Sequence, residues 1–184
     1  MNVYDWDNTI YRGDSTAGFI RYCFVKRPKC LLSLPRTAVC GLLYVLHLMP
    51  KKTFKQNMYH MFTYISDMES LVEEFTGSHM DHVKQWYLQQ QRQDDMVISA
   101  SPEFLIGSFC RRLNIRYMMA SVVDINTGIY TGENCHGREK VNRLRETYPG
   151  AMIDEFYSDS RSDAPLALEA KKAFIVKGDE RKPW

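Results

Sequence analysis

The chain has 184 residues, 45% of them hydrophobic, and a formal net charge of +2. This length suits one domain with an accessory part, and the apolar content is sufficient for a real core. A charge so close to balance does not indicate a nucleic-acid partner. The five cysteines lack the spacing of disulfide frameworks or zinc sites, which is typical of a reducing compartment. Because no signal-peptide pattern precedes Asp5, we expect a cytoplasmic protein.

The first predicted element is a short strand over residues 2–4, followed at once by Asp5 and Asp7 in the sequence DWDNT. Side chains two residues apart point the same way from an extended backbone. Two carboxylates held this close repel each other, so a folded protein must offset the repulsion with a cation, a proton or a hydrogen-bond network. The pair is therefore a candidate functional site.

The next region, residues 15–91, has a helical pattern and contains no convincing strand. Apolar residues recur in it at helical spacing, and Ser15 is placed to cap the first helix. Stripes of this kind are more often core than cofactor site. We therefore expect an all-helical insert of three to five helices.

Residues 30–49 of this insert are the most apolar stretch of the chain. Pro35 and Arg36 interrupt the stretch, so its uncharged part is too short to span a bilayer. We favour packing inside the protein over contact with a membrane. The membrane alternative stays open because basic residues flank the segment, namely Lys26, Arg27, Lys29, Lys51 and Lys52.

From residue 94 onward, strands and helices alternate. The predicted strands cover residues 96–98, 116–120, 155–158 and 173–176. The basic tail, residues 181–184, is predicted to be loose. Alternation of this kind indicates an α/β protein with a mostly parallel sheet covered on both faces. We divide the chain into an α/β core of residues 1–14 and 92–184 and a helical cap of residues 15–91.

Polar residues follow the ends of several predicted strands. Ser99 follows the second strand, Lys140 begins a helix, and Asp159 and Asp163 follow the fourth strand. In an open parallel sheet the carboxyl ends of the strands share one crevice. Four carboxylates without histidine or cysteine suit a hard divalent ion such as magnesium. Lys140, Ser99 and the amides entering the following helix are suited to hold a phosphate.

Phosphoryl transfer is the chemistry that uses all of these groups at once. A carboxylate can attack phosphorus to form an aspartyl-phosphate, and a second acid can protonate the leaving oxygen and then deprotonate a water. We therefore expect Asp5 to be the nucleophile and Asp7 the acid/base. A non-catalytic module that binds phosphate or phospholipid on the same fold is the alternative.

In their order and context, DWDNT, Ser99 of VISASP, Lys140 of GREKV and the acids of YSDSRSD resemble the four motifs of the haloacid dehalogenase (HAD) superfamily of phosphatases. The helical insert resembles the C1 cap of the phosphoserine phosphatase branch. The resemblance implies a Rossmann-like core with the strand order 5-4-1-2-3. It also implies a magnesium-dependent phosphomonoester hydrolase that acts on a small phosphorylated metabolite.

The same resemblance implies a role for each motif residue. The implied catalytic residues are Asp5, Asp7, Ser99 and Lys140. The implied metal ligands are Asp5, Asp7 through its backbone carbonyl, Asp159, and Asp163 as a ligand or support. The implied phosphate-binding residues are Thr9, Ser99, Ala100 and Lys140.

Two departures from the family pattern and one further similarity bear on the substrate and on the local backbone. Asn8 stands where glycine is common, which is tolerable because asparagine accepts unusual backbone angles. Asp14 stands where phosphoserine phosphatases carry a longer acid for the substrate amine, so phosphoserine itself is not the expected substrate; Tyr11 is a second candidate contact by position. The front of the insert is also similar to phosphatidylglycerophosphatase C, which makes a lipid-headgroup phosphatase the alternative function.

Overall fold

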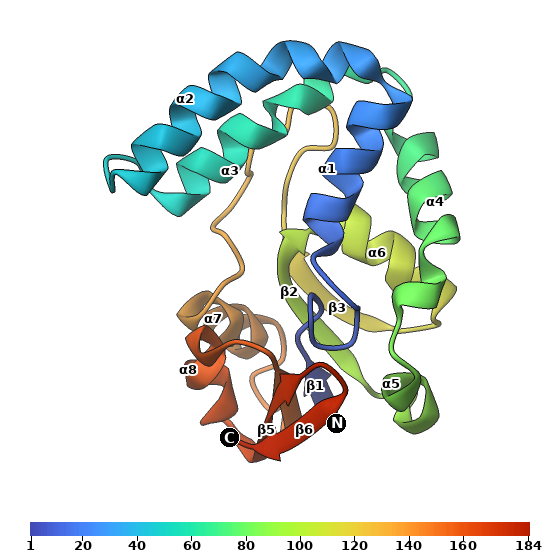
Figure 1. Cartoon of the computed structure of the whole chain (residues 1–184). Coiled ribbons are helices and arrows are strands. Elements are labelled where there is room, and N and C mark those ends of the chain that lie inside the picture. Colours follow the sequence, from blue (N-terminus) through green and yellow to red (C-terminus); the bar gives the residue numbers. More distant parts are fainter.

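The computed structural model describes residues 1–184 and contains a six-stranded sheet in the order β3-β2-β1-β4-β5-β6. The strands are β1 (Asn2–Tyr4), β2 (Met96–Pro102), β3 (Tyr117–Ser121), β4 (Ile153–Ser158), β5 (Ala170–Lys177) and β6 (Glu180–Pro183). All neighbouring strands are parallel except β5 and β6. The predicted α/β class and the strand order 5-4-1-2-3 are confirmed, and β1, which leads into DWDNT, is central (Figure 1).

Each face of the sheet packs against its own set of helices. Tyr4 and Val97 belong to a cluster of 30 buried residues on one face, and Val3 and Met96 belong to a cluster of 10 on the other. This alternation is the ordinary consequence of strand geometry. The first cluster includes α1 (Ser15–Lys26), α4 (Met68–Ser78) and α6 (Glu103–Arg112), and the second includes α7 (Arg138–Thr147) and α8 (Ala164–Ala167). The sheet is therefore the middle of three layers.

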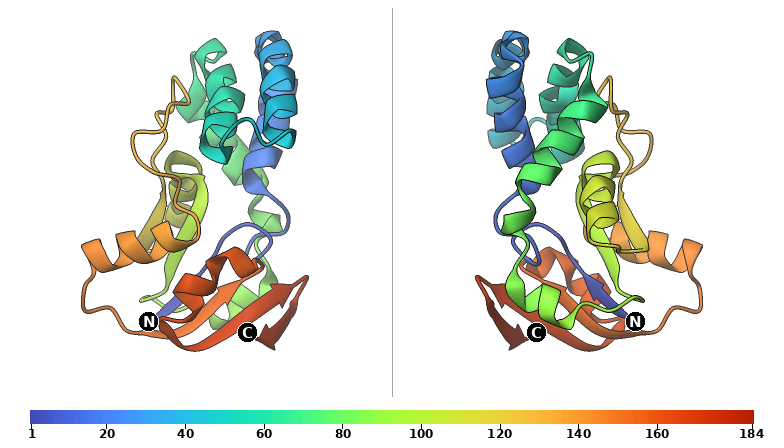
Figure 2. Two further views of the ribbon diagram at one scale, coloured as in Figure 1. Left: turned by 90° about the vertical axis from the view of Figure 1, so that its left-hand side faces the viewer. Right: turned by 90° about the vertical axis from the view of Figure 1, so that its right-hand side faces the viewer.

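The chain between β1 and β2 is helical, as predicted. Besides α1 and α4 it contains α2 (Leu34–Val45), α3 (Lys51–Tyr59), α5 (Gln85–Gln90) and three short 3-10 turns. The hairpin of α2 and α3 lies farthest from the sheet (Figures 1 and 2). By contrast, Trp86 and Tyr87 of α5 contact the ring of Tyr4 in β1. The boundaries chosen for the cap, residues 15 and 91, stay a prediction.

The C-terminal tail is ordered, so the prediction that it is loose was wrong. Residues Glu180–Pro183 form β6, which pairs with β5 in an antiparallel hairpin. Gly178, at a φ of 60°, occupies the first central position of the connecting turn, where glycine is favoured. Beyond the strand, the ring of Trp184 packs 6.1 Å from that of Phe156.

Most side chains of the apolar segment 30–49 are not packed inside the protein, which corrects the packing that we favoured. Only Cys30, Ser33 and Cys40 of this segment are buried. The segment forms a 3-10 turn and α2, and α2 packs mainly against that turn and α3. Most of its other side chains are exposed, because no protein layer covers the outer side of α2. None of the helices has both the length and the hydropathy required to cross a bilayer.

The predicted cap of α1 is also wrong, and Ser101, a second serine near a helix start, behaves in the same way. Asp14, not Ser15, caps α1 by accepting a 2.8 Å hydrogen bond from the amide of Ala17. Helix α6 has no side-chain cap, because β2 extends through Pro102 and Ser101 does not cap the helix. The hydroxyls of both Ser15 and Ser101 donate instead to the carboxylate of Asp7.

Candidate active site

The two acids of DWDNT project from a tight turn at the carboxyl end of β1. Three successive amides, those of residues 9–11, donate to the carbonyl of Trp6 over 3.0 to 3.2 Å. Asn8 has a φ of 58°, a left-handed conformation that asparagine accepts better than most residues. The turn therefore forms with asparagine in place of glycine, and it positions Asp5 and Asp7 at the crevice of the sheet.

A buried ion cluster occupies the strand ends. The ammonium of Lys140 donates to Oδ1 of Asp5 at 2.6 Å and to Oδ2 of Asp163 at 2.7 Å. The hydroxyl of Ser158 adds a 2.8 Å hydrogen bond to Oδ2 of Asp163. The side chain of Lys140 is only 2% exposed. Burying three charged groups costs desolvation energy, which their mutual attraction and hydrogen bonds must offset.

The pKa values in this cluster reflect burial first and the neighbouring charges second. Burial raises the pKa of Asp5, Lys140 opposes that rise, and Asp163 adds to it. For Lys140, burial alone lowers the pKa, but the two carboxylates outweigh burial and the net shift is upward. The lysine therefore remains an ammonium ion at neutral pH and balances negative charge in the crevice.

Asp7 is held by hydroxyl groups. Its Oδ1 accepts hydrogen bonds from the amide and the hydroxyl of Ser15, both at 2.6 Å, and its Oδ2 accepts one from Ser101. Thr16 in turn donates to the Ser101 hydroxyl at 2.8 Å. Burial, followed by the charge of Asp14, raises the pKa of Asp7 to about 6, although the serine bonds oppose the rise. A carboxyl group that titrates near neutrality is suited to acid/base catalysis.

Thr9 joins the first motif to the loop after β4. Its hydroxyl donates to Oδ2 of Asp5 at 3.2 Å and accepts from the amide of Asp159 at 2.9 Å. The carboxylate of Asp159 has no ion-pair or hydrogen-bond partner in the structure. Burial raises its pKa to about 6, and the charges of Asp5 and Asp163 add to the rise while Lys140 opposes it. Asp159 is therefore the uncompensated acid of the crevice.

These groups open onto a cavity of about 460 Å³. The predicted residues that line this cavity are Asp5, Asp7, Asp14, Ala100, Lys140, Asp159 and Asp163. The opposite wall comes from α1 and α3 and carries Arg21, Lys51 and Lys55. Lys55 donates to the carbonyl of Ala100 at 3.2 Å, and burial followed by the charge of Lys51 lowers its pKa. The cavity thus has an acidic floor with one buried lysine and a basic helical wall.

Three predicted contacts are not among the residues that line this cavity. Ser99 lies within β2, where its hydroxyl accepts a 3.1 Å hydrogen bond from the amide of Ser101. Thr9 is fully buried behind Asp5. Tyr11 stacks on Trp6 at 5.5 Å between ring centroids. The phosphate-binding roles of Ser99 and Thr9 and the substrate contact of Tyr11 stay predictions.

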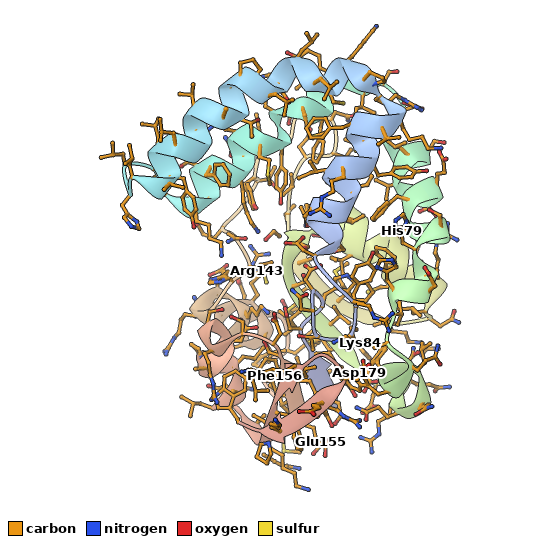
Figure 3. The ribbon with its side chains drawn as sticks, viewed as in Figure 1. His79, Lys84, Arg143, Glu155, Phe156 and Asp179 are labelled. Carbon is orange, nitrogen blue, oxygen red and sulfur yellow. The ribbon has the colours of Figure 1, made fainter.

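Several residues of the site were not predicted from the sequence. Ser101 could have been found, because it lies two residues beyond Ser99 and so on the same face of the strand. Lys84 gave no such signal. Its buried ammonium donates to the carbonyl of Asn8 at 2.6 Å and to that of Gly178, beside Asp179 (Figure 3). Lys84 therefore ties the first-motif turn to the β5–β6 hairpin.

The donor chemistry of the crevice fits a hard cation. No group of three histidine, cysteine, aspartate or glutamate side chains is arranged to hold a metal ion by itself. Magnesium keeps several water ligands and commonly needs only one or two carboxylates together with phosphate oxygens. Asp5 and the uncompensated Asp159 line the same cavity and supply oxygen donors of this kind.

Comparison with known proteins identifies the family. A sequence model of haloacid dehalogenase-like hydrolases matches residues 3–168. The chain belongs to this family. The resemblance drawn from the four motifs is thereby confirmed. Over 93 residues the chain is 33% identical to a probable phosphatase of Mycobacterium tuberculosis, in a match that covers 47% of this chain and 32% of the relative. The chain thus spans about a third of that relative's length.

Solved structures with the same fold include a protein of unknown function and a probable phosphoserine phosphatase. The first is from Bordetella pertussis. Its alignment covers 94% of this HAD-family chain and 87% of the Bordetella chain, with a TM-score of 0.71 and 17% sequence identity. The second, a probable phosphoserine phosphatase, is from Vibrio cholerae. Its alignment covers 94% of this chain and 55% of the Vibrio chain, with a TM-score of 0.65 and 11% sequence identity. At such low identity these matches establish the fold alone.

Proposed function

We propose that the chain is a magnesium-dependent phosphomonoester hydrolase that works through an aspartyl-phosphate on a small phosphorylated metabolite. One observation carries this proposal. Asp5 lines the cavity with Oδ1 bound to the Lys140 ammonium at 2.6 Å, whereas Oδ2 accepts only a longer hydrogen bond, 3.2 Å, from Thr9. The carboxylate is thus fixed at one oxygen and free to attack with the other.

The two steps follow from the placement of the acids. Oδ2 of Asp5 forms a bond to phosphorus while the bond to the leaving oxygen breaks, and Asp7 gives that oxygen its proton. In the second step Asp7 takes a proton from a water molecule that attacks phosphorus. The bond from phosphorus to Asp5 then breaks, which releases phosphate and restores the carboxylate. Ser15 and Ser101 orient Asp7 throughout, and Lys140 balances the charge.

Magnesium, when bound, neutralises charge on the phosphoryl oxygens and offsets the repulsion between the carboxylates. We assign the side chains of Asp5 and Asp159 to hold it, because both line the cavity, and the family resemblance adds the backbone carbonyl of Asp7. Asp163 already accepts hydrogen bonds from Lys140 and Ser158, so we assign it a supporting role.

The helical wall of the cavity bears on the substrate. Arg21, Lys51 and Lys55 line it, against the single acid Asp14 on the same side. This balance favours a leaving group that carries a further negative charge. A lipid-headgroup phosphatase remains the second candidate, because the neighbouring helix α2 exposes apolar side chains.

The test is phosphate release with magnesium from an aryl phosphate and a panel of phosphoserine, phosphoethanolamine, sugar phosphates, a bisphosphate and a short-chain lipid phosphate. We expect Asp5→Asn to abolish release while leaving the fold intact, and Asp81→Asn, an exposed acid outside the cavity, to have no effect. Turnover retained by Asp5→Asn would refute the mechanism. No release by the unmodified chain from any member of the panel would favour the non-catalytic binding module.

A further inference from the structure

Helix α2 turns an apolar side to solvent. Exposed apolar residues recur along it at intervals of three and four residues. They are Val39 (61% exposed), Leu42 (61%), Val45 (71%) and Leu46 (56%). The other side of the helix packs on α3, where the ring of Tyr44 stacks at 5.0 Å between centroids. Side chains on the outer side of α2 project away from the rest of the molecule (Figure 3). The helix therefore presents apolar side chains to solvent, where an ordinary surface helix presents polar ones.

These side chains belong to a larger exposed set, which we call the α2 apolar surface. It consists of Val25, Leu31, Leu32, Leu34, Val39, Leu42, Val45, Leu46 and Leu48. These are nine of the 16 large hydrophobic residues that the chain exposes, and all nine fall within residues 25–48. Single exposed hydrophobic residues are normal, whereas a concentration of this kind marks an interaction site.

The same part of the chain is basic and contains no acid. Residues 15–66 include eight of the 24 lysines and arginines and none of the 22 aspartates and glutamates. The rest of the chain therefore holds 16 basic and 22 acidic residues, so the formal charges are +8 and −6. Three of the eight pair with acids from elsewhere, whereas Lys29, Arg36 and Lys51 form no ion pair in the structure. Uncompensated positive charge therefore flanks the α2 apolar surface.

We propose that the α2 apolar surface docks on an anionic membrane surface, with α2 lying in the plane of the interface. Apolar side chains between basic residues, without acids, are the combination that interfacial helices use on anionic lipids. With 12 residues α2 cannot cross a bilayer, so the contact is peripheral. The proposal concerns binding alone and does not depend on the proposed hydrolase activity.

Charge distinguishes a membrane from a second copy of the chain. A symmetric dimer through this surface would bring two basic, acid-free segments against each other, with the unpaired Lys29 and Arg36 in each. Like charges facing each other across an interface oppose association. An anionic lipid layer instead supplies both the negative charge and the apolar phase that this surface lacks.

The experiment is sedimentation of the full chain with vesicles of neutral phosphatidylcholine and with vesicles that also contain phosphatidylglycerol. We expect the chain to pellet with the anionic vesicles at low salt, and less so at high salt or with neutral vesicles. The triple variant Val39→Ser/Leu42→Ser/Val45→Ser should lose at least about tenfold in partitioning. Met152→Ser/Leu168→Ser, which changes hydrophobic residues that are 71% and 86% exposed outside the surface, is the matched control and should bind normally.

A charge variant tests the electrostatic part separately, and it keeps the proposal testable should the triple variant not fold. Lys29→Glu/Arg36→Glu should weaken binding to anionic vesicles and leave the small binding to neutral vesicles unchanged. The proposal is overturned if the unmodified chain stays in the supernatant with anionic vesicles at low salt. It is also overturned if a folded triple variant pellets like the unmodified chain, or if the chain sediments as a dimer that the triple variant dissociates.

Discussion

The strand-end crevice and helix α2 depart from ordinary burial in opposite directions. In the crevice Asp5, Lys140 and Asp163 are charged and buried, whereas in α2 Val39 and Leu42 are apolar and exposed. Both arrangements are unfavourable for an isolated side chain. The cluster of Asp5, Lys140 and Asp163 offsets its cost within the chain, because the ammonium lies between the two carboxylates. The α2 apolar surface has no partner within the chain, so whatever covers it comes from outside.

This comparison has an energetic consequence. Buried groups whose charges balance one another are strongly coupled, so removal of one leaves the others buried and unpaired. Groups that contact only solvent can be changed with little effect on folding. The two regions should therefore respond very differently to substitution.

Within the crevice, the largest expected effect on stability comes from Lys140→Met, which leaves Asp5 and Asp163 without their cation. We expect a loss of about 3–5 kcal/mol in the free energy of unfolding at neutral pH. The loss should shrink at acid pH, where protonation removes the unpaired charges. Lys171→Met, at an exposed ion pair with Asp154, should change stability by at most about 1 kcal/mol. Urea unfolding measures both, and equal losses would show that the crevice is not coupled.

A smaller effect is expected from Asp163→Asn. The amide oxygen can still accept a hydrogen bond from Lys140 or Ser158, but the second negative charge is lost. Because a hydrogen bond to a charged group contributes about 1.5–3 kcal/mol, we expect a loss of about 2 kcal/mol. Replacement by leucine, which accepts no hydrogen bond, should cost more. If both variants unfold at the same urea concentration, the hydrogen bonds of Asp163 contribute nothing.

The motifs allowed much of this crevice to be predicted from the sequence. The predicted acids follow strands and Lys140 begins a helix, and parallel strands bring such positions to one edge of a sheet. The acids are Asp5, Asp7, Asp159 and Asp163. Their hydrogen-bond partners were not predictable from the sequence. A serine hydroxyl can donate to any acceptor nearby, and only the fold decides which carboxylate lies near it. Ser15 and Ser101 stand at sequence positions typical of helix caps, yet the hydroxyls of both donate hydrogen bonds to Asp7.

The two other failures have a different physical origin. The residues of β6 are exposed and show no alternation of polar and apolar side chains, so only pairing with β5 reveals the strand. For residues 30–49 the sequence correctly indicated an apolar helical segment. Composition shows that a segment is apolar but not whether a partner covers it, and α2 turns apolar side chains outward.

Asp95 is a buried acid with no cation paired to it. It therefore tests how much a paired cation contributes to the stability of a buried carboxylate. It is 1% exposed, and its Oδ1 has no hydrogen-bond partner. Burial raises its pKa from 3.8 to about 6, so the folded chain holds the proton more tightly than the unfolded chain does. Ionisation of Asp95 therefore lowers stability as the pH rises from about 4 to above 6.

Asp95→Asn should accordingly stabilise the fold at pH 7–8 by about 1–2 kcal/mol. The gain should fade as the pH falls through 6 and should be absent below about pH 3, where the acid is protonated in both states. Thermal unfolding across this pH range measures the effect, with the exposed Asp81→Asn as control. A gain that does not change with pH would show that it arises from something other than the buried charge.

The smallest effect is expected in α2. Val39→Ser/Leu42→Ser/Val45→Ser should change the free energy of unfolding by less than about 1 kcal/mol, because these side chains already contact water. By contrast, Phe75→Ala, which truncates a fully buried ring, should cost about 3–5 kcal/mol. Unfolding in dilute, lipid-free solution measures both. If the triple variant instead lost several kcal/mol, the α2 apolar surface would be covered in solution by the protein itself, and its contrast with the self-compensated crevice would disappear.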